Sequence, residues 1–449
     1  MKLLLYCNER AIGSLDTDGD ASAPVNSPAR NAWQLQFDTA PGTPLSPHLS
    51  AAAGAVVNAP AVRDFFVNYL PEPPHAERVA RSFRPAPRTE AELLAALGQE
   101  LTGAFALAPG LLGNARYAPL AFDAFEERVA ASRRSADVIA FAPHAPRLSL
   151  AGAQDKFALW YDPQAADPDA RLKIPLGRAA STHIFKPAST DSRFAMLPAN
   201  EFACASLAAA CGLPVAETRI ATFGGVRVLV VARFDRVKRG AAVTRLHQID
   251  LCQMRNTSRE RKYGSEGGID TAELFDACRY TRVPALSRRM LLHAWLFNFL
   301  IGNADAHAKN HSFLWQPAAA FDSNPASTPA SASATAAPVP AQWQAAPLYD
   351  MLSVAPYLPS QPQSMGLLDE YRPGWFEAAH WRELARLAGV TPAYLAAEAR
   401  RMIEVMQRTA PALAVELRAA LTTDELDFLA ERVNPVVRER CTWLQHALV

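Results

Sequence analysis

A polar segment that directly follows an apolar stretch carries the residues best suited to chemistry. It reads LIGNADAHAKNHSFL, residues 300–314, and places Asn310 five positions after Asp305. Protein kinases use this D-x-x-x-x-N spacing in their catalytic loop, where the aspartate accepts the proton of the substrate hydroxyl and the asparagine oxygen binds Mg²⁺. The spacing alone is common, and a polar loop held by local capping bonds is the structural alternative. The segment therefore indicates phosphoryl transfer once further motifs support it.

The same segment is compatible with a different kind of metal site. His307 and His311 are four residues apart, so both imidazoles could reach a zinc ion from one face of a helix. The segment has no HExxH motif, and it follows Gly302, a residue type that favours the end of a helix. We therefore favour the kinase interpretation over a zinc site.

Two further segments supply what a phosphotransferase needs beside a base. Asp350 lies among apolar residues in APLYDMLSV, where a carboxylate suits a second Mg²⁺ ligand. Lys186 ends the apolar run of STHIFKP, and Glu201 on the next predicted helix could orient it through an ion pair. Lys186 could equally be a surface lysine at a strand end. LVVARFDR, residues 229–236, predicts a strand that leads into a connection between lobes, which could offer backbone groups to adenine.

A small-residue segment, RLSLAGAQDKFAL at residues 147–159, predicts a mobile loop near phosphates. Gly152 lies between two alanines and is flanked by Ser149 and Lys156. The spacing does not match a Walker A motif. Another glycine-rich segment, GSEGG at residues 264–268, is interpreted as a turn and nothing more.

The elements that must position these residues follow from the patterning along the chain. Residues 1–110 alternate short apolar runs with turn signals and two helix candidates, which predicts a small α+β subdomain. Residues 111–245 are strand-rich towards their end, and residues 246–449 are mainly helical. Strands followed by helices predict an α+β fold with two lobes and a cleft between them. Residues 316–346 are rich in Ala, Pro and Ser, so we expect a flexible surface insertion.

Composition narrows the class of protein. The chain has 449 residues and a formal net charge of +1, which gives no electrostatic case for direct nucleic-acid binding. None of the six cysteines forms a CxxC pair, and buried thiols suit a reducing cytoplasm. The apolar start MKLLLYC is shorter than a signal-peptide core, and the longest apolar segment, residues 290–301, is too short to cross a bilayer. We expect a soluble cytoplasmic protein with no membrane association.

Taken together, the motifs resemble the HipA family, the serine/threonine kinase toxins of bacterial type II toxin–antitoxin modules. The matching segments occur in family order between residues 147 and 354: SLAGAQDK, HIFKP, NEFACASLA, ARFDR, RLHQIDLCQ, IGNADAHAKNHS and LYDMLS. FFVNYLPEPPHAERVAR and GQELTGAFALAPG resemble the family's N-terminal subdomain. The resemblance thus covers nearly the whole chain.

The resemblance implies a bilobal, protein-kinase-like α+β fold with a β-rich N-lobe and an all-helical C-lobe. It also implies ATP and Mg²⁺ as cofactors and phosphorylation of protein serine or threonine. Asp305 would be the catalytic base, and Asn310 and Asp350 the metal ligands. The remaining roles would be contacts to the nucleotide by Lys186, Lys156, Phe234, Asp235, His307 and Tyr349, and autophosphorylation at Ser149, in a loop that gates ATP entry.

Partners are implied in the same way. Family members pair with HipB, a helix-turn-helix antitoxin, so DNA would be contacted only through that partner. The protein substrate would be a translation component, for example an aminoacyl-tRNA synthetase. Two departures from the family pattern stand out: Ala232 replaces a usual glutamate in the hinge, and Ile249 replaces a usual acidic residue. A kinase for a non-protein hydroxyl and a catalytically weak co-repressor remain alternatives.

Overall fold

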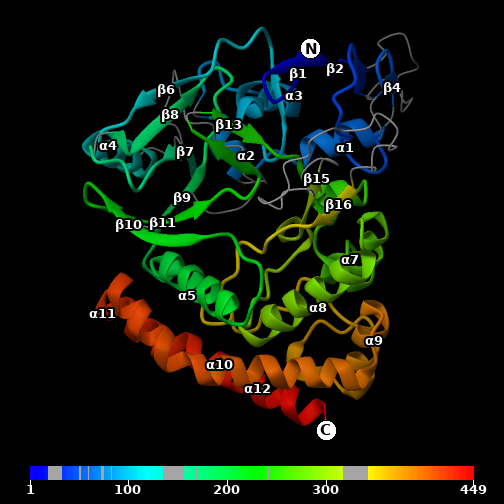
Figure 1. The fold of residues 1–449 in the computed structure, drawn as a ribbon, viewed down its shortest axis with the longest axis vertical. Helices are drawn as coiled ribbons and strands as arrows, with labels where there is room; N and C mark the ends of the chain where they lie inside the picture. Colours follow the sequence, from blue (N-terminus) through cyan, green and yellow to red (C-terminus); the bar gives the residue numbers. More distant parts are fainter. Residues whose placement is uncertain are drawn as a thin grey trace, which may run out of the picture.

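The computed structural model shows strands gathered in one half of the molecule and long helices in the other (Figure 1). The mixture of helices and antiparallel sheets confirms the α+β class. The division at residues 110 and 245 stays a prediction. The structure describes residues 1–18, 33–49, 52–58, 60–71, 75–81, 83–134, 156–167, 170–189, 191–240, 242–316 and 342–448.

An antiparallel sheet of five strands, in the order β4-β3-β2-β1-β5, forms the N-terminal part. Leu3 and Leu5 alternate along β1 and are fully buried, as a half-buried strand requires. Thr89 and Glu92 form a capping box that starts the helix α3. The elements are β1 Lys2–Cys7, β2 Arg10–Asp16, β3 Gln34–Phe37, β4 Val56–Asn58, α1 Pro60–Val67, α2 His75–Ala80, α3 Glu90–Leu97 and β5 Phe105–Ala108.

A second antiparallel sheet of six strands has the order β10-β11-β9-β7-β8-β6. Its core is aromatic, with Phe125 of α4 packed against Phe185 of β9 and Phe223 of β10. The elements are β6 Arg116–Pro119, α4 Phe122–Arg134, β7 Phe157–Tyr161, β8 Leu172–Leu176, β9 His183–Pro187, α5 Leu197–Ala210, β10 Thr218–Phe223 and β11 Val226–Ala232, followed by the hairpin β12 Arg236–Arg239 and β13 Ala242–Arg245.

The C-terminal part is mainly helical, with the long helix α10 running below α5 and α8 in Figure 1. The expectation that it is all helical is wrong, because a three-stranded sheet, β14-β15-β16, lies within it. The elements are β14 Gln248–Asp250, α6 Leu251–Met254, α7 Thr271–Asp276, α8 Pro284–Leu300, β15 Ser312–Gln316, β16 Gln342–Ala345, α9 Ala378–Ala388, α10 Pro392–Ala420, α11 Thr423–Phe428 and α12 Asn434–Ala447.

The strand β16 also corrects the bounds of the expected insertion. Residues 342–345, which were assigned to it, pair with β15 in antiparallel register. Trp343 is buried and packs on Trp315 with ring centroids 5.3 Å apart, so this end of the segment belongs to the core. Residues 317–341 lie outside the described part.

Two expectations about composition can be compared with the described residues. All six cysteines are free thiols, and five of them are buried. In the described part of the chain, no helix is both long and apolar enough to cross a membrane.

Candidate active site

Lys186 is the centre of an ionic triad in which Lys186 and Glu201 are buried and Asp350 is partly exposed. It lies on β9, and its Nζ donates to both carboxylate oxygens of Glu201 on α5, at 2.7 and 2.8 Å, and to Oδ1 of Asp350 at 2.6 Å. The Lys186 and Glu201 side chains are only 6% and 4% exposed, so water screens this attraction little. Burial alone would lower the pKa of Lys186, but Asp350 and Glu201 hold it above its ordinary value. The site therefore keeps a fixed cation, which suits a phosphate group.

Asp350 is held in an unusual backbone conformation. Its φ of 57° lies in the left-handed region, which aspartate tolerates better than most residues. Burial would raise the pKa of its carboxyl group, but Lys186 and Lys156 hold that pKa well below its ordinary value. The group is thus an ionised, hard oxygen ligand of the kind that Mg²⁺ prefers.

The catalytic loop meets the Asp350 segment through one tyrosine. The hydroxyl of Tyr349 donates to the backbone carbonyl of Lys309 at 2.7 Å and shares a hydrogen bond of 2.6 Å with Ser312. Asn310 directly follows Lys309, and Asp350 directly follows Tyr349. The Tyr349–Lys309 bond therefore brings Asn310 and Asp350 near each other despite their separation in sequence. This arrangement is the observation that makes a joint metal site feasible.

The amide of Asn310 is oriented by the same loop. Its Nδ2 donates to the backbone carbonyl of Asp305 at 2.9 Å. This bond identifies which end of the amide is the nitrogen, and it leaves the oxygen as the end that could bind a metal ion. An amide oxygen and the Asp350 carboxylate are a fitting pair of protein ligands for Mg²⁺, which keeps several waters and binds substrate phosphates as well. The residues present therefore fit the expected ion.

The zinc alternative finds no support in the described residues. No group of three or more His, Cys, Asp or Glu side chains gathers there in a way that could hold a metal ion. His307 is buried, and this burial, together with the nearby charge of Lys262, lowers its pKa well below the ordinary value. Nδ1 of His307 has no hydrogen-bond partner within the described chain. The neutral ring can therefore form a hydrogen bond with a ligand through this nitrogen.

Phe234 lies beside Tyr349, with ring centroids 5.7 Å apart and planes tilted by 40°. This contact brings the end of the segment after β11 next to the Lys186–Asp350 pair. The backbone around Ala232 is itself ordered, because the Ala232 amide donates to Glu217 and the Arg233 amide to Thr182. Binding of adenine here stays a prediction.

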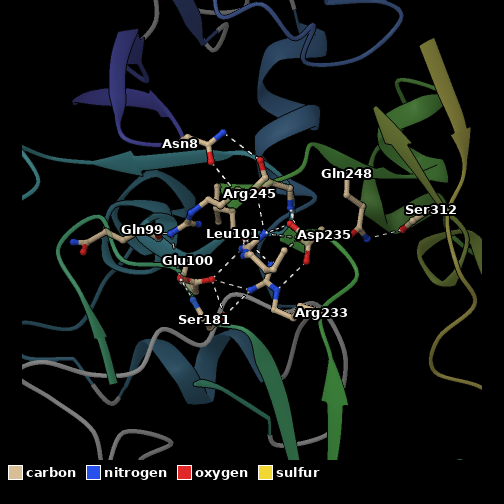
Figure 2. Close-up of polar contacts among 12 residues, drawn as sticks. Asn8, Gln99, Glu100, Leu101, Ser181, Arg233, Asp235, Arg245, Gln248 and Ser312 are labelled. Atoms are coloured by element: carbon tan, nitrogen blue, oxygen red, sulfur yellow. Dashed lines mark hydrogen bonds and ion pairs between the residues drawn. The ribbon is translucent and has the colours of Figure 1, made fainter. Parts of the chain in front are cut away.

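Figure 2 shows the carboxylate of Asp235 inside a buried ionic cluster. It accepts bonds from Arg233 at 2.8 and 3.0 Å, from Arg236 at 2.7 Å and from the Gly103 amide at 2.7 Å. The side chain is only 4% exposed, and its carboxylate joins the N-terminal sheet region to the segment after β11. Its contact with the nucleotide stays a prediction.

Glu100 is the second carboxylate of this cluster and is fully buried. Arg233 donates to it at 2.8 Å, Arg236 at 3.0 Å and Arg245 at 3.2 Å, and Ser181 adds a hydroxyl bond of 2.9 Å (Figure 2). The cluster therefore ties α3's end to three later segments of the chain.

The loop around Ser149 can be placed only in part. Ser149 lies outside the described residues. Lys156, the first described residue after that gap, is buried, and its charge helps to lower the pKa of Asp350. Its predicted role near phosphates is compatible with this position and stays a prediction.

Three contacts to the catalytic loop were not predicted from the sequence. Nζ of Lys309 donates to the backbone carbonyl of Asn68, after α1, and to Asp250, both at 2.7 Å. The hydroxyl of Tyr263 donates to Oδ1 of Asp305 at 2.9 Å. The local motifs gave no signal for any of these contacts, because the partners are 241, 59 and 42 residues apart.

Known proteins resemble this chain in sequence and in fold. The family model of the HipA-like C-terminal domain matches residues 148–414, and that of the HipA N-terminal domain matches residues 3–108. The chain belongs to the HipA family. Y4mE of Sinorhizobium fredii is 32% identical over 83% of this chain and 82% of its own. The serine/threonine-protein kinase toxin HipA of Shewanella oneidensis is 28% identical over 83% of this chain and 80% of its own.

A solved HipA structure also matches nearly the full length. HipA of Shewanella oneidensis, in its complex with HipB and operator DNA, superposes with a TM-score of 0.73 at 25% identity, covering 99% of this chain and 96% of its own. The HipA-like C-terminal match contains every expected site residue from Ser149 to Asp350.

Proposed function

We propose that this HipA-family chain is an ATP- and Mg²⁺-dependent serine/threonine protein kinase. The observation that carries the proposal is the Lys186–Glu201–Asp350 triad, joined to the catalytic loop through Tyr349. A kinase site needs a fixed cation for the phosphates, oxygen ligands for the metal and a carboxylate base nearby. Membership of a family whose relative is named a serine/threonine-protein kinase toxin supports the same conclusion.

The proposed step is an in-line transfer. The acceptor serine oxygen forms a bond to the γ-phosphorus, the bond from that phosphorus to the β–γ bridging oxygen breaks, and ADP leaves. Asp305 takes the proton of the acceptor hydroxyl. Lys186 would hold nucleotide phosphates, while Asn310 and Asp350 would hold Mg²⁺, whose positive charge offsets the charge on the transferring group. Before the metal binds, Lys186 neutralises Asp350.

The finer assignments extend the proposal. Ser149 would be an autophosphorylation site whose modification opens the gate loop, so the kinase switches itself off. A HipB-like antitoxin would be the partner and would supply the contact with DNA, in line with the complex formed by the Shewanella protein. The acceptor would be a cytoplasmic protein such as an aminoacyl-tRNA synthetase.

The deciding experiment compares Asp305→Asn with the wild type. Both are incubated with γ-labelled ATP and Mg²⁺, and Ser149 is examined by mass spectrometry. We expect the wild type to carry phosphate at Ser149 and to arrest growth when expressed, and Asp305→Asn to do neither while it remains folded. Asp427→Asn, the same change at an exposed helical position, is the matched control. Equal labelling of Asp305→Asn and the wild type would contradict the assignment of the base.

A further inference from the structure

Tyr263 contacts the catalytic aspartate directly. Its hydroxyl donates to Oδ1 of Asp305 at 2.9 Å, although the two residues lie 42 positions apart in the chain. A hydrogen bond from a neutral donor to a carboxylate favours the ionised form and restricts its rotation. The contact therefore bears on the direction of the carboxylate, which a general base needs to have fixed.

The backbone around Tyr263 is fixed on both sides. The carbonyl of Lys262 accepts from the Ala308 amide of the catalytic loop at 3.1 Å, and the Gly264 amide donates to the Ser364 carbonyl at 2.8 Å. Ser364 in turn bonds to the Ala304 carbonyl, through its amide at 2.9 Å and its hydroxyl at 2.7 Å. The neighbours of Tyr263 are thus tied to Ala308, three positions after the catalytic aspartate, and through Ser364 to Ala304, directly before it.

The GSEGG segment has a role beyond a simple turn. Its last residue, Gly268, donates its amide to the Tyr263 carbonyl at 2.9 Å, which folds the segment back onto the tyrosine. A Cβ at Gly268 would lie 2.2 Å from the backbone oxygen of Arg261, so this close approach requires glycine. The segment therefore forms a rigid support for Tyr263.

The ring of Tyr263 is held as well as its backbone. It packs edge-on against His307 with ring centroids 5.1 Å apart, and Nζ of Lys262 lies 4.6 Å from the ring centroid. Together these contacts fix where the hydroxyl points. A phenol on a mobile side chain could not define the direction of a carboxylate, whereas one restrained in this way can.

We propose that Tyr263 is a positioning residue of the reaction: its hydroxyl sets the rotation of the Asp305 carboxylate and so directs the base at the acceptor. The inference rests on the proposed kinase function. Tyr263 acts through Asp305, with no bond formed or broken at the tyrosine itself. It also explains why a segment outside the recognisable motifs closes so tightly onto the catalytic loop.

The test is the steady-state kinetics of Tyr263→Phe, a change that removes only the hydroxyl. We expect kcat to fall by up to about 100-fold, the scale of a misplaced reacting group, and KM for ATP to stay within about twofold. The split between kcat and KM is the readout, because loss of the bond turns the base away without touching the nucleotide contacts.

Tyr371→Phe is the matched control. The Tyr371 hydroxyl also donates to a carboxylate, that of Asp270 at 2.8 Å, and bonds to the Gly264 carbonyl, but it does not contact the base. If this variant lowers kcat as much as Tyr263→Phe does, the effect is loop packing and the positioning role is wrong. An unchanged kcat in Tyr263→Phe, or a rise in KM that matches the fall in kcat, would also overturn it.

A second measurement does not depend on catalysis. 3-Fluorotyrosine placed at position 263 is titrated by ¹⁹F NMR in the full-length protein with Asp305 and with Asp305→Asn. Loss of the neighbouring carboxylate should lower the titration midpoint of the phenol, because the phenolate is no longer repelled. Identical titrations would overturn the contact. If the wild type transfers no phosphate yet this midpoint shifts, the proposed function fails while the Tyr263–Asp305 bond stands.

Discussion

At the scale of single residues, one lysine serves both stability and the proposed chemistry. Lys186 is bonded to two carboxylates in a largely buried site, so its removal leaves like charges facing each other. The same Nζ is the group that we assign to the nucleotide phosphates. The two roles predict that a substitution here affects folding energy and transfer together.

We predict that Lys186→Met lowers the free energy of unfolding by about 3 kcal/mol and phosphate transfer by at least about 100-fold. Urea denaturation and labelled-ATP transfer measure the two effects. Lys238→Met is the control, because Lys238 pairs with Asp162 at a half-exposed site and should cost less than about 1 kcal/mol. Similar losses of stability and transfer in the two variants would show that the Lys186 triad contributes no more than an ordinary surface ion pair.

Sequence reasoning succeeded for residues whose motif is local. Lys186 and Glu201 were predicted as an ion pair, because a strand and the following helix place them close together. It did not reveal the bonds that Asp235 accepts from Arg233, Arg236 and the Gly103 amide, the last of which lies 132 residues away. Tyr263 was missed for the same reason, since contacts made by folding leave no local pattern.

At the scale of elements, the hairpin of β15 and β16 is continuous in space although 25 residues separate its strands. Gln316 and Gln342 face each other at its open end. An antiparallel pair in this register can be closed by a two-residue turn. The composition of the segment concealed β16, because four strand residues followed a long run of Ala, Pro and Ser.

We predict that replacing residues 317–341 by Asn-Gly leaves autophosphorylation unchanged. The free energy of unfolding should stay equal or rise by up to about 2 kcal/mol, because a shorter loop loses less entropy on closure. Urea denaturation and mass spectrometry at Ser149 check both. Trp343→Ala, which removes a buried ring from β16, should instead cost about 3–5 kcal/mol. A folded but inactive hairpin variant would show that the insertion takes part in the reaction.

At the scale of the whole molecule, the buried cluster of Figure 2 joins parts that the sequence presents as separate modules. Glu100 comes from the N-terminal part, Arg233 and Asp235 from the hinge, and Arg245 from the end of the β12–β13 hairpin. The order of strand-rich and helical parts was predictable from patterning along the chain. The ionic cluster that joins these parts was not predictable, because each of its charged residues taken alone resembles an ordinary surface residue.

The cluster holds three arginines against two carboxylates, an excess of one positive charge. Burial and repulsion from Arg233 lower the pKa of Arg236 to about 10. Burial would raise the pKa of Asp235, but Arg233 and Arg236 hold it at about 2, against an ordinary value of 3.8. Its stabilising contribution is therefore complete above pH 3.8 and is lost as the pH falls through about 2. At pH 7 Asp235 and Arg236 are therefore both ionised.

Because positive charge is in excess, removing a carboxylate from the cluster should destabilise the fold more than removing an arginine. Glu100→Gln leaves three buried arginines with one carboxylate, so we expect the free energy of unfolding at pH 7 to fall by about 3–5 kcal/mol. Arg245→Met removes the surplus charge and only bonds of 3.2 Å, and should cost less than half as much. Urea denaturation of the two variants at pH 7 decides. Equal losses would mean that packing, and not charge balance, holds the N-terminal part to the hinge.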